Sequence, residues 1–257
     1  MIFRKLLKNL LANLATWALK KHKIKLVVVS GWYATETARE LCYAVIGVKH
    51  EVRRINKNPW WDFSIPLAVL GYKDERRNPL AWLWLMIKAS LLLTFGKANP
   101  HTLILNLNYA HADTVRYWSS LIKPQVLMIH NFKEEHRLLK QMIKATKQIN
   151  GTIIIQQQDF VKLSKNLLAY DNVFTVGNEA EAHIVISKNS NKDISFKYKS
   201  QEYTLKTTTM PGISAELLAC SLAVAITEGV EPHDALYGMV KYPTSSQLLS
   251  KLRSGLL

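Results

Sequence analysis

Acidic residues and cysteines are scarce in this sequence of 257 residues. It has 19 aspartates and glutamates against 34 lysines and arginines, which gives a formal net charge of +15. Such a balance favours contact with polyanions: nucleic acid, anionic lipid or a phosphorylated substrate. The only two cysteines, Cys42 and Cys220, lie in apolar, helix-like contexts. We therefore expect them to be reduced core residues, and we expect an intracellular, cytoplasmic protein.

Several common functional patterns are also missing. There is no zinc-finger spacing, RNP motif or arginine-rich tail, so a nucleic-acid-binding module rests on charge alone and remains a second alternative. There is no internal repeat and no low-complexity linker. Ser30, His136 and Asp159 follow different predicted elements, and nothing in their spacing brings them together. We therefore predict neither a hydrolase triad nor a metal site.

The first 24 residues are typical of a basic amphipathic helix. Their apolar stretch Leu10–Leu19 is interrupted by Asn13 and is shorter than the roughly 20 residues that span a bilayer. No signal-peptide cleavage pattern follows it. Two interpretations stay open: a helix packed on the domain's own surface, or an interfacial helix on the anionic inner face of the cell membrane. The predicted apolar stripe is Leu6, Leu7, Leu10, Leu11, Leu14, Trp17 and Ala18.

A second apolar segment, Pro79–Phe95, is hydrophobic nearly all round, and Lys88 is its only charge. Burial against the core is the default expectation for such a helix. The alternative is that Trp82 and Trp84 extend a membrane-facing patch.

Strands and helices alternate along residues 25–257, which predicts one α/β domain with a mostly parallel sheet flanked by helices. A small antiparallel β addition follows it. The carboxyl ends of the parallel strands are where a ligand is expected. The predicted strands are 24–30, 103–107, 126–129, 152–156, 173–176, 182–187, 194–198 and 202–207, and the predicted helices are 35–46, 112–122, 133–148, 160–168, 213–228 and 232–240.

The most informative stretch is Lys25–Leu41, KLVVVSGWYATETAREL, which has the strand, glycine turn and helix start of a phosphate-binding loop. With the order of elements, it resembles the central ATP-binding domain of the Mur ligase family. The nearest type is the MurF-like UDP-N-acetylmuramoyl-tripeptide–D-alanyl-D-alanine ligase. These are ATP-dependent amide-bond ligases of peptidoglycan synthesis. The resemblance runs from Lys25 to about Leu252, and it implies a P-loop-type fold.

The loop departs from the family pattern Thr-Gly-x-x-Gly-Lys-Thr-Ser/Thr. The chain keeps Gly31, but Ala34 replaces the second glycine, Thr35 the lysine and Glu36 the metal-binding hydroxyl, followed by Thr37. Loss of the lysine removes the charge that contacts the β- and γ-phosphates. A carboxylate at Glu36 would fill the positive end of the helix dipole and repel a triphosphate.

Other family positions depart as well. Asn106 stands where the family has a magnesium-holding glutamate, and an amide is a poor replacement on a hard cation. His136 matches a metal-associated histidine, although a solvated helix residue is the simpler interpretation. Asp159 is all that remains of a nucleotide-seating Asn-Ala-Asp-Asp-Pro segment. Four aromatic residues, which would fill the vacated space or stack on a ligand, are Trp32, Tyr33, Trp60 and Trp61.

These departures predict a non-catalytic Mur-ligase-like protein that binds or scaffolds a partner in peptidoglycan synthesis. The resemblance also implies that the family's C-terminal ligase domain is not part of this chain. No cofactor is expected, and the partner is expected to be a protein, with peripheral contact to an anionic membrane through residues 1–24. The alternative is an active ATP-dependent Mur-type ligase with an atypical phosphate loop, which would need ATP and Mg²⁺.

Overall fold

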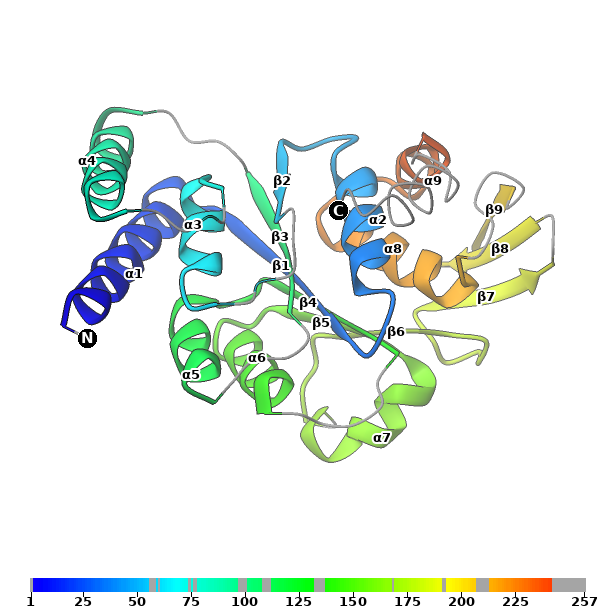
Figure 1. Cartoon of the computed structure of the whole chain (residues 1–257). Helices are drawn as coiled ribbons and strands as arrows, with labels where there is room; N and C mark the ends of the chain where they lie inside the picture. Colours follow the sequence, from blue (N-terminus) through cyan, green and yellow to red (C-terminus); the bar gives the residue numbers. More distant parts are fainter. Residues whose placement is uncertain are drawn as a thin grey trace.

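The computed structural model shows an α/β protein built on one long, twisted sheet (Figure 1). It describes residues 2–55, 59, 61–73, 75, 78–96, 101–107, 112–131, 137–167, 169–190, 193–206 and 213–241. Nine strands of this described part form the sheet, in the order β2-β3-β1-β4-β5-β6-β7-β8-β9.

The sheet is parallel from β2 to β7 and antiparallel from β7 to β9. This arrangement confirms the predicted fold class, including the antiparallel addition. The strands are β1 (Lys25–Gly31), β2 (Val52–Arg54), β3 (Thr102–Asn106), β4 (Val126–His130), β5 (Thr152–Gln156), β6 (Val173–Gly177), β7 (Ile184–Asn189), β8 (Asp193–Tyr198) and β9 (Gln201–Lys206).

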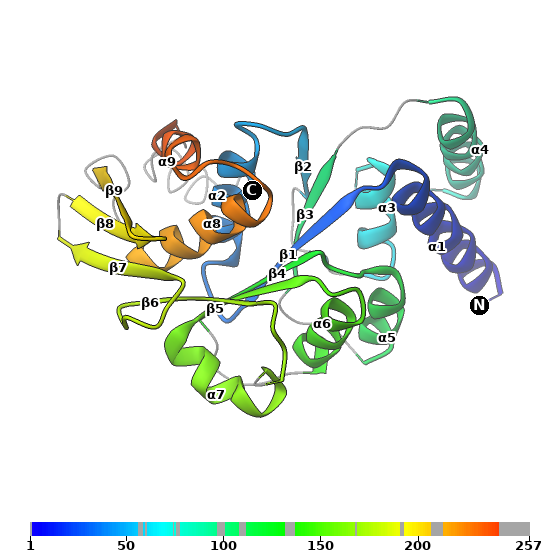
Figure 2. The same ribbon diagram turned by 180° about the vertical axis from the view of Figure 1, so that it is seen from behind.

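Helices cover both faces of the sheet because alternate residues of each buried strand point to opposite sides. In β1, Val27 and Val29 pack towards α2, α8 and α9, whereas Leu26 and Val28 pack towards α1, α3, α5, α6 and α7. Figure 2 shows the same layers from behind. The helices are α1 (Ile2–His22), α2 (Thr35–Ile46), α3 (Ser64–Leu70), α4 (Pro79–Phe95), α5 (Ala112–Leu121), α6 (Arg137–Gln148), α7 (Gln157–Leu167), α8 (Ala215–Thr227) and α9 (Pro232–Lys241).

Most predicted elements are present, and two that were not predicted are β2 and α3. β2 is a three-residue edge strand with two arginines, and α3 contains Pro66, so neither gives a clear periodic pattern. Helix α7 begins at Gln157, three positions before the predicted start. Residues 132–136, where the predicted helix 133–148 starts, lie outside the described part of the chain.

The default expectation for Pro79–Phe95 was wrong in part. Helix α4 is only partly buried: it lies at the edge of the molecule in both views, packed on α1 (Figures 1 and 2). Only Trp82, Leu85, Ala89 and Leu93 are buried. No helix among the described residues is both long enough and apolar enough to cross a bilayer.

The predicted stripe of α1 is divided between two environments. Leu7 and Leu11 are buried with the neighbouring helices, whereas Leu6, Leu10 and Trp17 are exposed to solvent. The four buried apolar positions of α1 are Leu7, Leu11, Ala15 and Ala18, which lie on one side of the helix at spacings of four, four and three.

Candidate functional site

The candidate site lies at the carboxyl edge of the parallel sheet, where β1 meets β3 and β4. Gly31 at the end of β1 pairs with His130 at the end of β4, and Asn106 ends β3 on the other side. The chain runs from β1 to one side of the sheet and later crosses over to β4, so this is the point where the strand order reverses. Such switch points are where open α/β sheets bind ligands.

The loop after β1 is closed by contacts within the chain. A side chain on Gly31 would place its Cβ 2.0 Å from the His130 carbonyl oxygen, so only glycine fits between the strands. The Trp32 backbone N–H donates to the Asn131 carbonyl oxygen at 3.2 Å. Ala34, at a left-handed φ of 57°, begins α2 without a side-chain cap. One backbone donor of the loop is therefore used internally.

The residues that replace the family's lysine and hydroxyls form the first turn of α2. Thr35 is buried, and Glu36 and Thr37 are half-buried. A threonine hydroxyl carries no charge, so Thr35 offers none of the attraction that a lysine offers a phosphate. Glu36 lies where the helix dipole favours a carboxylate.

A buried arginine stands beside Asn106. Arg39 of α2 is 6% exposed and donates from Nη1 to Asn106 Oδ1 at 3.2 Å. Its Nε and Nη2 donate to Glu40 Oε1 at 3.0 and 2.8 Å. Arg54 from β2 reaches the same Glu40 oxygen at 2.8 Å. Two guanidinium groups thus share one carboxylate, and the Asn106 amide oxygen already has a cationic partner.

A second polar network crosses β4, β5 and α7. Gln156 Nε2 lies 2.9 Å from His130 Nδ1, and Gln158 Nε2 donates to Gln156 Oε1 at 2.9 Å. His130 is 1% exposed. Burial lowers the His130 pKa to about 4, against the opposing effect of Glu216 and Asp159. The imidazole is therefore neutral at pH 7, and Gln156 donates to its unprotonated nitrogen. The sequence signal for His130 is its place at the end of a buried parallel strand.

Two further polar groups lie at this edge. Asp159 is 2% exposed and accepts from Lys162 Nζ at 2.9 Å within the first turns of α7. Ser30, near the end of β1, is buried, and its Oγ has no hydrogen-bond partner among the described residues. His136 lies outside the described residues, so its prediction is not tested.

The predicted aromatic residues separate into two groups. Trp32 and Tyr33 stand on the loop with 57% and 62% of their surface exposed, and the Tyr33 ring lies edge-on to His130 at 6.4 Å. Trp61 lies among other helices, with its ring 4.9 Å from Phe63 and 6.4 Å from that of Trp82. Trp60 lies outside the described part. Exposure at the loop suits stacking on a ligand or partner better than filling an enclosed space.

The donor set does not suit a magnesium-bound triphosphate. Among the described residues, no three histidine, cysteine, aspartate or glutamate side chains cluster as metal ligands would. Mg²⁺ prefers carboxylate and phosphate oxygens. At this edge Asn106 bonds to a buried guanidinium, and Thr35 stands where the resemblance places the phosphate-binding lysine.

Solved structures match this arrangement closely enough to identify the fold. MurF from Acinetobacter baumannii superposes with a TM-score of 0.67 at 14% identity, over 90% of this chain and 49% of that one. The fold is that of a Mur ligase domain. MurF ligase from Thermotoga maritima, in complex with ADP, gives 0.65 at 20% identity, over 89% and 52%. A pseudomurein peptide ligase type C from Methanothermus fervidus gives 0.54 at 11%, over 86% and 50%.

The likeness is one of fold and not of sequence. No protein-family model matches the chain, and no curated protein matches it. The chain spans about half the length of the Mur ligase structures named above. The Mur ligase fold explains why the β1–α2 loop, β3 and β4 meet at one edge.

Proposed function

We propose that this protein is a non-catalytic Mur-ligase-like binding protein that serves a protein partner in cell-envelope synthesis. The fold it shares with MurF supports the link to that pathway. The chemistry at the carboxyl edge of the sheet supports the loss of catalysis.

The observation that carries the proposal is the Arg39–Asn106 contact. A buried guanidinium bonds to the residue that stands in place of the family's magnesium-holding glutamate. A divalent cation placed beside Asn106 would meet this positive charge in a site of low dielectric, where like charges repel far more strongly than in water. Glu40 does not relieve the repulsion, because Arg39 and Arg54 already share its Oε1.

The loop supports the same conclusion. In a phosphate-binding loop the backbone N–H groups cradle the phosphates. Here the Trp32 N–H donates to Asn131, and the lysine is replaced by the buried Thr35. What remains exposed at the loop is a pair of aromatic rings, Trp32 and Tyr33, of the type that is enriched in protein interfaces.

The test is a thermal-shift and calorimetric titration of the full chain with Mg-ATP and Mg-ADP. We expect no saturable binding and no change in Tm at millimolar nucleotide. A ligand present at 100 times its Kd would stabilise the fold by about 2.7 kcal/mol, enough to raise Tm by about 5 °C or more. Micromolar affinity for either nucleotide would contradict the lost site. As a matched comparison, Thr35→Lys restores the lysine alone and tests whether the loop can still hold a phosphate.

An active Mur-type ligase is the alternative, and the likeness to an ADP complex favours it. It predicts Mg²⁺-dependent ATP turnover that Asp159→Asn abolishes. If the protein shows no turnover by itself or with cell extract added, the non-catalytic proposal stands.

A further inference from the structure

Helix α4 presents large apolar side chains on the side that faces away from α1. Its buried residues, Trp82 and Leu85 among them, pack with Leu7 and Leu11 of α1. On the outer side a surface helix normally carries polar residues. Here seven apolar side chains are between 44% and 82% exposed: Leu80, Leu83, Trp84, Ile87, Leu91, Leu92 and Phe95. A contiguous apolar surface of this kind marks an interaction site.

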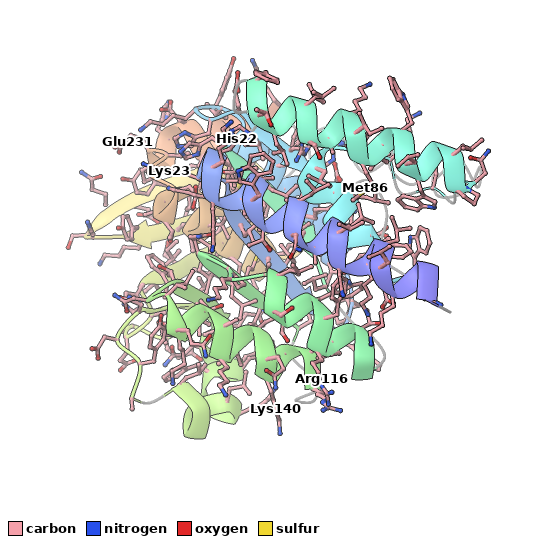
Figure 3. All side chains as sticks on the ribbon, turned by 90° about the vertical axis from the view of Figure 1, so that its left-hand side faces the viewer. His22, Lys23, Met86, Arg116, Lys140 and Glu231 are labelled. Atoms are coloured by element: carbon pink, nitrogen blue, oxygen red, sulfur yellow. The ribbon has the colours of Figure 1, made fainter. Side chains whose placement is uncertain are left out.

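Helix α1 adds a second apolar stripe beside this one. Leu6, Leu10 and Trp17 are 56%, 43% and 40% exposed, at spacings that place them on one side of the helix. Figure 3 shows α4 and α1 side by side on the same face of the molecule, with Met86 between them. The Lys21 ammonium joins the two helices by donating to the Leu93 carbonyl and, at 2.9 Å, to that of Thr94. We call these two helices the α1–α4 face.

The charges on this face are of one sign. Neither α1 nor α4 contains an aspartate or glutamate. The exposed lysines on and directly after the two helices are Lys5, Lys20, Lys21, Lys23 and Lys88. A second copy of this chain would bring the same positive charges together. An anionic lipid surface complements them, and each lysine or arginine near such a surface contributes about 1 kcal/mol.

We propose that the α1–α4 face docks on an anionic phospholipid bilayer, with both helices lying in the plane of the interface. Exposed leucines, a phenylalanine and tryptophans enter the boundary between headgroups and acyl chains, and the lysines remain at the headgroups. Trp84 and Trp17 are of the residue type that favours this boundary. The inference does not depend on whether the carboxyl edge of the sheet binds nucleotide.

The experiment is flotation of the full chain with vesicles of phosphatidylcholine alone or mixed with phosphatidylglycerol. We expect binding to the mixed vesicles, weakened by salt. Leu83→Glu, Ile87→Glu and Leu91→Glu together should lower binding by at least about tenfold, because each change removes apolar surface that the bilayer would bury. The control is Val161→Glu with Tyr237→Glu, two residues of α7 and α9 that are 67% and 54% exposed. It should bind as the parent does.

A second pair of variants separates a docking face from simple attraction of a basic protein. Lys20→Glu with Lys23→Glu changes the net charge by the same amount as Lys197→Glu with Lys241→Glu, on β8 and α9. Only the first pair should reduce binding strongly. Circular dichroism confirms that each variant is folded.

Three results would overturn the proposal. The first is no binding to anionic vesicles at low salt. The second is equal loss of binding in both lysine pairs, which would indicate non-specific attraction. The third is a dimer in solution that the α4 triple variant dissociates, which would assign this face to a second copy of the chain.

Discussion

The carboxyl edge of the sheet and the α1–α4 face differ in how their chemistry is satisfied. At the edge, polar and charged groups are buried and bonded to one another: Arg39 to Asn106 and Glu40, and His130 to Gln156. On the α1–α4 face, apolar side chains such as Leu80 and Phe95 are 78% and 82% exposed. These groups at the carboxyl edge therefore have partners within the chain. The region outside the sheet's core layers has exposed apolar surface.

Burial explains this difference. A buried polar group without a partner costs about 1–3 kcal/mol, so partners from the same chain stabilise the polar groups at this edge. A single exposed leucine costs the fold little, whereas several exposed apolar side chains on one face mark an interaction site. The predictions below test how much the internal contacts of the carboxyl edge stabilise the fold, in order of decreasing effect.

Gly31→Ala should have the largest effect. Its Cβ would lie 2.0 Å from the His130 carbonyl oxygen, and both atoms belong to paired strands that cannot separate without breaking the sheet. We expect a loss of at least about 4 kcal/mol in the free energy of unfolding, measured by urea denaturation.

Gly229→Ala is the matched control for the glycine change. Gly229 has a φ of +77°, and a Cβ added there would meet nothing within 4 Å, so an alanine has only the backbone cost, about 1 kcal/mol. Equal losses in the free energy of unfolding of the two variants would show that the contact with the His130 carbonyl oxygen does not cause the effect of Gly31→Ala.

Arg39→Met should have the next largest effect on the free energy of unfolding. The variant keeps most of the side-chain volume but leaves the Asn106 oxygen and half of the Glu40 charge without their buried partner. We expect a loss of about 3 kcal/mol, at the lower end for a broken buried pair because Arg54 still contacts Glu40.

Arg54→Met is the comparison for Arg39, since its side chain is 32% exposed and reaches the same oxygen. It should cost about 1 kcal/mol or less. The same two variants also probe the proposed function: if Arg39 excludes the metal, Arg39→Met is the variant in which Mg²⁺ binding could return. Detectable Mg²⁺ binding by the unmodified protein would show that the guanidinium does not exclude it.

His130 should make stability depend on pH. Its pKa is about 4 in the fold and about 6.5 in the unfolded chain, because burial disfavours the charged ring. Between these values the unfolded state binds more protons, so stability is complete above pH 6.5 and falls as pH drops towards 4. The shift corresponds to about 3–4 kcal/mol.

The check is a series of urea midpoints from pH 7.5 to 5, above the range in which most carboxylates titrate. His130→Gln removes the titrating group and should flatten the profile in that window. Glu216 and Asp159, which face the ring from α8 and α7, act in the opposite direction and limit the slope. An unchanged slope in His130→Gln would mean that another group is responsible.

The sequence predicts the strand and helix that hold this site better than it predicts the contacts between the side chains. The strand at β1 and the helix at α2 follow from a buried β-branched run and a clear helical pattern, and both are found as predicted. The Arg39–Asn106 contact joins residues 67 positions apart, and it depends on where β3 lies beside α2. No local sequence pattern shows that these two residues meet. The exposure of α4 was only the alternative expectation for a related reason: its composition is that of a core helix, and its position at the edge of the molecule exposes it.

Ala34→Gly should have the smallest effect, and its sign is opposite to the others. Ala34 has a φ of 57°, where the Cβ of an alanine costs about 1–2 kcal/mol and a glycine fits without strain. Part of this gain is cancelled because glycine gives the unfolded chain more freedom, so we expect a net stabilisation of about 0.5–1 kcal/mol in urea denaturation.

The change also restores the family's second glycine. If the variant is more stable and still does not bind Mg-ATP, the Ala34 side chain is not what prevents nucleotide binding. The exclusion then rests on the missing lysine at Thr35 and on the buried guanidinium of Arg39. A loss of stability would show instead that the left-handed turn is held by contacts of the alanine methyl group.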